Sequence, residues 1–451
     1  MRSPSGFSWG KREVSFYNNI AIAHPSFPKK LLAVTANKIT SQSLKKSAFI
    51  KNDTKRRPQK RKNNAGLKPS GGSSFNYKTA IIGILATKFR HNSFGIQDVY
   101  FRQLINNIYQ SGGIGYVFTG QNIDWKRRLV YGYYLEDAGI NWLERWFPMP
   151  DVCYDRSFHE TPQTSIKNLA KLMQKKGIKI FNTSIGDKLK VYKTLASYPD
   201  VAEYQPDTRL LRSGALLKSM LNKYREVYVK PLNGTKGRGV FKVTMENGNN
   251  QYHLRRSGSS QSVFRNDIAQ IWSAIYRKHT VKMLVQAGIK NPGLGEHFDL
   301  RVLVQKDARN QWHITAKAAR LGCGGSVTTN IHTGGVVKEL DAILRERGLT
   351  SKEINVINKN IIWLTLRIAE ILDHSSVAIG ELGLDFIIDE YLKVWFIEAN
   401  RKPGRQILDI MGAEAKNTSF MRPVEYALYL SGKPYGPERS APAVLTHSAP
   451  D

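Results

Sequence analysis

Two carboxylates and an amide stand close together in one predicted β-hairpin, residues 380–404, GELGLDFIIDEYLKVWFIEANRKPG. The hairpin comprises strands Gly383–Ile388 and Val394–Ala399 and a turn within Asp389–Lys393. Because side chains alternate along a strand, Glu398 and Asn400 point to the same face. If Asp389 pairs with Val394, the same register places Asp385 directly across from Glu398.

Two like charges that face each other across a ladder repel, and a bound divalent cation removes that repulsion. Oxygen ligands of this kind suit Mg²⁺, with Mn²⁺ as a substitute, and Mg²⁺ also keeps waters and substrate phosphates in its shell. We therefore interpret Asp385, Glu398 and Asn400 as a set of metal ligands. The alternative is an ordinary hairpin with a charged end.

A glycine-rich turn between two strands, Tyr228–Thr244, is the second feature that indicates phosphate chemistry. Gly234, Gly237 and Gly239 allow backbone N–H groups to approach a phosphate closely. Lys230 ends the first strand, where its ammonium can reach phosphate oxygens. The motif is neither a Walker A loop nor a dinucleotide fingerprint, because GxxxxGK[ST] is absent and a strand follows the glycines. The alternative is a plain turn beside a lysine.

These segments belong to an ordered series of motifs. The series runs GDK at 186–188, the lysine and glycine loop, LVQAGI at 284–289, FDLRVLV at 298–304, AARLGCGGSVTTNIHTGG at 318–335, and LGLDFII with FIEAN within 382–400. In this order the chain resembles the ATP-grasp superfamily over residues 78–430, with motifs like those of ribosomal-protein glutamate ligases and glutathione synthetases. The stretches FPMPDVCYDR and FNTSIGDKLKVYKTL are similar to the YheC/YheD family of endospore coat-associated proteins.

The resemblance implies an ATP site between two α+β subdomains. Lys188 and Lys230 match the two phosphate lysines of the superfamily. Gln286 and Ile289 match the hinge that receives adenine, with an ordinary strand end as the alternative. Asp299 could contact ribose, or it could pair with Arg301. For Lys188 the alternative is an exposed lysine at a helix start.

Three further residues, Arg301, Arg320 and Asn330, match groups that meet the phosphates or the acylphosphate oxygens. Buried pairing of arginine with carboxylate is the alternative for Arg301 and Arg320. Arg405 could hold a substrate carboxylate, or it could be a solvated residue at a helix start.

The implied reaction joins a carboxylate to an amine through an acylphosphate, at the expense of ATP and with Mg²⁺ bound. The sequence names neither the acid nor the amine. The alternative is a non-catalytic nucleotide-binding protein of spore structure or assembly. The intact phosphate lysines and metal-ligand set favour the ligase, and no protein nucleophile is required.

Composition bounds the partners and the compartment. The chain has 451 residues and a formal net charge of +32, from 68 basic and 36 acidic residues. Residues 1–77 hold 16 Lys and Arg against Glu13 and Asp53, a local charge of +14. This extension favours a polyanion or spore-coat partner, whereas no base-reading motif predicts specific nucleic-acid binding. Two cysteines form no disulfide framework, and no apolar run approaches the roughly 20 residues of a membrane span. We expect a cytoplasmic protein, associated with the spore coat if the resemblance extends to location.

The predicted fold class is α/β and α+β, an ATP-grasp fold with a preceding α/β domain and a basic, partly disordered N-terminal extension. The expected parts are a small or degenerate β-like module at 1–50, a basic flexible linker at 51–77, an α/β domain at 78–182, an ATP-grasp domain at 183–432 and a flexible tail at 433–451. The ATP-grasp domain divides into a glycine-loop subdomain to residue 289 and a metal-site subdomain from residue 290. Predicted helices span Asp98–Gln110, Ser165–Lys176 and Ile354–Leu372, and a buried strand, Thr79–Leu85, opens the α/β domain.

Overall fold

The structure is a computed structural model that describes most of the chain beyond residue 78. The described residues are 79–87, 94–136, 141–158, 166–234, 237–246, 251–257, 262–276, 281–290, 298–322, 335–374 and 378–433. All of them belong to one compact unit, Phe75–Asp451. The module expected at 1–50, the linker at 51–77 and the tail after Lys433 lie outside the described residues.

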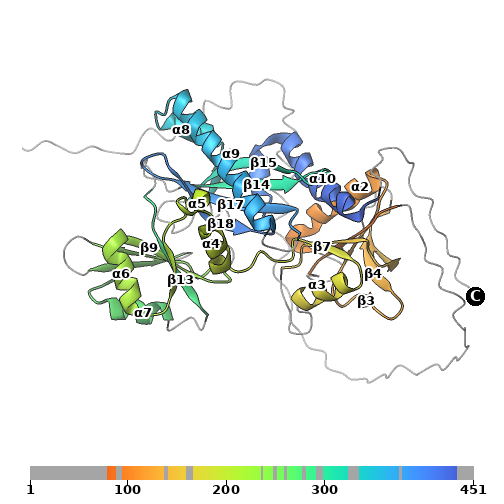
Figure 1. Ribbon diagram of the computed structural model, residues 1–451, viewed down its shortest axis with the longest axis horizontal. Helices are drawn as coiled ribbons and strands as arrows, with labels where there is room; N and C mark the ends of the chain where they lie inside the picture. The colour runs from red at the N-terminus through yellow and green to blue at the C-terminus, as the bar shows by residue number, and fades with distance from the viewer. Residues whose placement is uncertain are drawn as a thin grey trace, which may run out of the picture. The chain divides into compact units, whose positions relative to one another are not determined.

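The first sheet, near the N-terminal end of the described chain, mixes parallel and antiparallel strands (Figure 1). Its elements are β1 (Ile81–Leu85), η1 (Gly95–Gln97), α2 (Asp98–Gln110), β2 (Ile114–Phe118), β3 (Ile123–Asp124), β4 (Leu129–Tyr134), β5 (Leu143–Pro148), β6 (Val152–Asp155), α3 (Ile166–Lys175) and β7 (Lys179–Phe181). The strand order is β3-β4-β2-β1-β6-β7, with β5 paired to β4. Strand β1 is buried along its whole length between parallel neighbours, which explains its continuous apolar run. The helix predicted at Asp98–Gln110 is confirmed with the same bounds.

The second sheet carries the glycine loop and is antiparallel throughout. Its part of the chain contains α4 (Lys188–Ala196), α5 (Pro199–Ala202), β8 (Thr208–Leu211), α6 (Gly214–Tyr224), β9 (Glu226–Pro231), β10 (Phe241–Met245), β11 (Tyr252–Arg256), β12 (Ser262–Arg265), α7 (Ile268–Tyr276) and β13 (Met283–Ala287). The order is β12-β11-β10-β9-β13-β8. Helices α6 and α7 pack their apolar residues on one face of this sheet, so its other face is left for the site.

The third sheet carries the predicted metal hairpin. Its elements are β14 (Phe298–Lys306), β15 (Trp312–Leu321), β16 (Val336–Lys338), α8 (Leu340–Glu346), α9 (Ser351–His374), β17 (Glu381–Ile388) and β18 (Val394–Asn400), followed by η3 (Gln406–Ile410) and α10 (Gly412–Ser431). The strand order is β16-β15-β14-β17-β18. Helix α9 covers one face with an apolar stripe that includes Ile357, Ile361 and Leu364.

Helix α10 belongs to the core of the first sheet although it ends the described chain. Its Phe420 and Val424 share a cluster with Ile82 and Phe101, and Figure 1 shows α10 beside α2. The α/β range predicted at 78–182 is therefore packed in part by the C-terminal end of the range predicted at 183–432. No described helix combines the length and the apolarity that crossing a bilayer requires.

A fully buried carboxylate, Glu381, ties the start of β17 to the first sheet. Its Oε1 accepts hydrogen bonds from Tyr154 Oη at 2.5 Å and Arg156 Nη1 at 2.8 Å, both at the end of β6. Its Oε2 accepts from Arg405 Nη2 at 2.6 Å and Gln305 Nε2 at 3.1 Å. The bonds to Tyr154 and Arg156 hold β17, the strand that carries Asp385, against the first sheet, although these partners are more than 200 residues away in sequence.

We expect Glu381→Gln to reduce the free energy of unfolding by about 3 kcal/mol, because two buried guanidinium groups lose their counter-charge. Burial alone raises the pKa of Glu381, but Arg405 and Arg156 outweigh it and hold that pKa below its ordinary value of 4.5. Its stabilising contribution is therefore complete above pH 4.5 and is lost as the pH falls through the lower folded-state pKa.

Urea unfolding across this pH range measures the effect. The difference between wild type and variant should be largest above pH 4.5 and shrink below it. Glu346→Gln, at an exposed ion pair with Lys338, is the matched control and should cost less than about 1 kcal/mol. Equal effects of the two substitutions would show that the buried network does not stabilise the fold.

Candidate functional site

A β-bulge in β18 sets the geometry of the predicted metal hairpin. At the turn, Ile388 pairs with Val394, so the expected pairing of Asp389 with Val394 is wrong by one residue. The register then shifts between Asp385 and Phe386, and Asp385 does lie across from Glu398 as predicted. The extra residue changes the alternation of the strand, so that Val394 faces the core under α9 while Glu398 faces the site.

Asp385 is held by two arginines on the same face of the third sheet. Arg301, directly across the ladder, grips the carboxylate with Nε and with Nη2, the latter at 2.8 Å. Arg320 Nη2 lies 3.1 Å from the Asp385 carboxylate and 2.6 Å from Oδ2 of Asp299. Arg301 and Arg320 are therefore both paired with buried carboxylates, which was the alternative to a phosphate contact.

Glu398 meets the first predicted phosphate lysine. Lys188, at the start of α4, lies 3.2 Å from Glu398 Oε2 and donates to the carbonyl of Gly234 at 3.0 Å. It therefore joins the glycine loop of the second sheet to the hairpin of the third. Asn400 Nδ2 lies 3.2 Å from Glu398 Oε1 and 3.4 Å from Asp385 Oδ2, so the amide bridges the two carboxylates.

The second lysine, Lys230, is buried at 7% exposure at the end of β9. Burial and the charge of Lys188 lower its pKa to about 8, although Glu398 and Asp385 favour its charged form. The same charges act on Glu398: burial raises its pKa, but Lys188, Lys230 and Arg301 outweigh burial and hold that pKa well below its ordinary value. These shifts place Lys230 in the electrostatic environment of the hairpin.

The glycine loop requires glycine at two of its three predicted positions. Gly237 and Gly239 have φ angles of 69° and 72°, in the left-handed region that side chains disfavour. Gly234 instead has its backbone packed above Pro231, where a Cβ would be 3.1 Å from the proline. The positive φ angles explain why glycine stands at 237 and 239, and the Gly234 N–H donates to the carbonyl of Pro231 at 3.3 Å.

The predicted adenine hinge lies at the end of β13. Gln286 is buried and its Nε2 donates to Thr208 Oγ1 at 2.9 Å, so its side chain is already fixed within the sheet. Ile289 follows the strand and is partly exposed. Asn330 and His332 lie outside the described residues.

Arg405 has a different environment from either expectation. It is neither solvated nor open to a substrate, because Glu381 Oε2 and Tyr100 Oη accept from its Nη2 at 2.6 and 2.7 Å. The hydrogen-bond network around Glu381 was not predicted from the sequence. Its only sequence signal is a carboxylate at the start of an otherwise apolar strand, and its partners Tyr154 and Arg156 are distant in the chain.

The oxygen ligands of the hairpin fit a divalent cation. Asp385 lies across the ladder from Glu398, and Asn400 turns its Nδ2 toward a carboxylate oxygen of each, so two carboxylates and an amide lie close together. Among the described residues, no group of three or more His, Cys, Asp or Glu side chains is arranged to hold a metal. Four cationic side chains surround Asp385 and Glu398: Arg301, Arg320, Lys188 and Lys230. This excess of positive charge is suited to binding a complex of metal and polyphosphate.

Comparison with known proteins identifies the family of the chain. The profile described as "YheC/D like ATP-grasp" matches residues 177–430, more than half of the chain. The chain belongs to this ATP-grasp family. The resemblance inferred from the ordered motifs is thereby confirmed.

Two relatives and two solved structures illustrate the similarity. The endospore coat-associated proteins YheD and YheC of Bacillus subtilis are 29% and 23% identical, over 78% and 70% of this chain and 79% and 88% of their own. A RiPP-associated ATP-grasp ligase of Chryseobacterium gregarium matches with 14% identity and a TM-score of 0.42, over 80% of this chain and 99% of its own. D-alanyl-alanine synthetase A of Vibrio cholerae matches with 13% identity and a TM-score of 0.46, over 79% of this chain and 98% of its own.

We expect Lys230→Met to leave the unliganded protein as stable as the wild type, or more stable. The reason is that burial lowers the pKa of Lys230, so the fold holds its charged form at a cost. The same change should weaken ATP binding by about tenfold or more, because a phosphate contact is lost. Urea unfolding and titration calorimetry measure the two effects.

Lys359→Met, at an exposed position on α9, is the control and should change neither quantity. If Lys230→Met destabilised the fold while nucleotide affinity stayed unchanged, Lys230 would be a structural residue and not a phosphate ligand.

Proposed function

We propose that the protein is an ATP- and Mg²⁺-dependent carboxylate–amine ligase that acts through an acylphosphate. The observation that carries the proposal is Lys188, which contacts the glycine loop and Glu398 at once. Lys188 thus links the glycine loop of the second sheet to the hairpin of the third, which supports a nucleotide site between these two sheets. Membership of the ATP-grasp family supports the same conclusion.

In the proposed reaction the side chains of the cleft act by position and charge. Lys188, Lys230 and the N–H groups of the glycine loop bind the phosphates and stabilise the charge that develops on them. Asp385, Glu398 and Asn400 would hold Mg²⁺, which would supply neutralisation of the phosphate charge. Because the arginine and lysine partners already surround these carboxylates, little rearrangement of protein charge is needed.

The covalent steps need no protein nucleophile. An oxygen of the substrate carboxylate attacks the γ-phosphorus, and ADP leaves with the electron pair of the bridging bond. The amine then attacks the acyl carbon, inorganic phosphate leaves, and the amine gives up a proton. Arg301 and Arg320, which flank Asp385, are proposed to hold the transferred phosphoryl oxygens.

The names of the two curated relatives lead us to propose an association with the endospore coat. The cytoplasmic location expected from the cysteine content and a polyanion partner for the basic extension belong to the same proposal. The acid and amine remain to be identified, and a screen of ATP turnover against amino acids and acidic polymers, with product masses recorded, identifies them. ATP binding without turnover of any pair would instead favour a nucleotide-binding assembly protein.

We expect Glu398→Gln to abolish ATP turnover and to shrink the rise in melting temperature that Mg²⁺-ATP produces. A ligand stabilises a protein only through its affinity for the folded state, and this variant loses a metal ligand. Without ligand, the variant should be somewhat less stable than wild type. This reverses the expectation from facing carboxylates alone, because Lys188 and Lys230 would lose their counter-charge.

Thermal melts of both proteins with and without Mg²⁺-ATP measure these effects. The matched control is Glu346→Gln on α8, which should keep the full ligand-induced shift. A full shift in Glu398→Gln as well would contradict the metal-site assignment.

We expect deletion of residues 1–74 to leave nucleotide binding intact and to weaken binding of a polyglutamate probe. The compact unit that holds the cleft begins at Phe75, and the deleted part carries 16 basic residues. Binding measured at low and moderate salt separates the two activities, because polyanion binding is screened by salt. Loss of ATP binding on deletion, or unchanged polyglutamate binding, would count against this role for the extension.

A further inference from the structure

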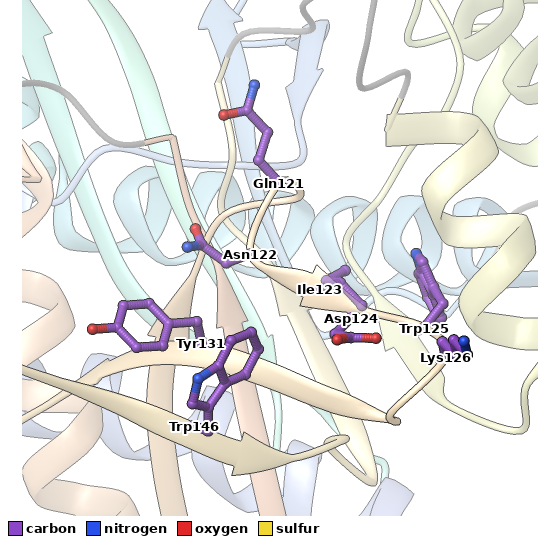
Figure 2. A pocket seen from close by; sticks show the side chains of 8 residues that line it. All are labelled: Gln121, Asn122, Ile123, Asp124, Trp125, Lys126, Tyr131 and Trp146. Carbon is purple, nitrogen blue, oxygen red and sulfur yellow. The ribbon is translucent and has the colours of Figure 1, made fainter. Parts of the chain in front are cut away.

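A groove of about 600 Å³ lies at the antiparallel end of the first sheet. It is formed by β3, the turn that follows it, β4 and β5, and none of its residues belongs to the nucleotide cleft. Figure 2 shows the rings of Tyr131 and Trp146 beside one another, with Asn122 next to them and Asp124, Trp125 and Lys126 nearby. A volume of this size is within the range of ligand-binding sites.

Three aromatic rings line the groove, and two of them pack against each other. Trp146 is 45% exposed, and its cross-strand neighbour Tyr131 packs against it edge-on with ring centroids 5.2 Å apart. Arg127 lies 5.0 Å from the centre of the Trp146 ring. Trp125 is the third ring. A large indole left nearly half exposed on a fixed strand indicates a stacking surface for a ligand.

The polar residues of the groove are amides and one balanced pair of charges. The Oδ1 of Asn122 accepts from the backbone N–H of Thr119 at 3.3 Å, and its carbonyl accepts from that of Tyr131 at 2.8 Å, so the residue is fixed in place. Asp124 accepts from the backbone N–H of Arg127 at 2.9 Å. With Lys126 as the only lysine or arginine in the lining, the lining charges cancel.

We propose that this groove binds a saccharide chain. Sugar rings present weakly positive C–H faces, which stack on the negative faces of indole and phenol rings. Their hydroxyl groups both donate and accept hydrogen bonds, which matches the amides of Gln121 and Asn122. A polyanion fits less well, because the lining carries no net positive charge to attract it.

The test uses the full chain and two probes, a β-1,4-linked glucose hexamer and its N-acetylated counterpart. Calorimetry or ligand-observed NMR should detect binding of at least one probe to the wild type. Trp146→Ala should weaken that binding by about tenfold or more, while affinity for Mg²⁺-ADP stays unchanged. Trp363→Ala, at a tryptophan on α9 that is 43% exposed, is the matched control and should bind the saccharide like the wild type.

Asn122→Ala provides a second variant if Trp146→Ala fails to fold, and it should also weaken binding. The proposal is overturned if the wild type binds neither probe at millimolar concentration, or if both groove variants bind as the wild type does. It is also overturned if an oligothymidylate binds more tightly than both saccharides, provided that this binding is lost in Trp146→Ala and weakens as salt is added. That result would assign the groove to single-stranded nucleic acid.

Discussion

The facing carboxylates Asp385 and Glu398 are the constraint on which the rest of the site depends. Two such charges on neighbouring strands repel unless cations lie close to them. Arg301 and Arg320 supply positive charge from the third sheet, and Lys188 supplies it from the start of α4. The buried charge of Lys230 completes the set from the second sheet. The two carboxylates are thus surrounded by more positive than negative charge, and in the proposed function this excess receives the phosphates of the nucleotide.

The same constraint explains why a strand irregularity and a distant buried ion pair matter to the site. The bulge in β18 lets Phe396 enter the apolar core while Glu398, two residues on, turns to the opposite face. Glu381 holds the start of β17 against Arg156 and Arg405, so the hairpin cannot slide along its neighbours. Position of the carboxylates is therefore set by core packing on one side and by the first sheet on the other.

Local pattern was sufficient to predict much of the fold. The helix at Asp98–Gln110 has the predicted bounds, because its apolar periodicity is regular over that range. The pairing of Asp385 with Glu398 was also predicted, although the pairing at the turn was not. A pattern of period two cannot show a bulge, since the inserted Ile397 is itself apolar and looks like one more strand residue. The partners of Glu381 could not be predicted, because contacts across more than 200 residues leave no local signal.

Hydrogen–deuterium exchange of the full chain, with and without Mg²⁺-ADP, tests the location of the nucleotide most directly and needs no knowledge of the other substrates. If the nucleotide binds at the proposed site, we expect slower exchange in the glycine loop after β9, at the end of β13 and in the β17–β18 hairpin near Asn400. The groove at β3–β5 should show no change. Nucleotide binding that leaves exchange in the glycine loop and the hairpin unchanged would show that the nucleotide binds elsewhere.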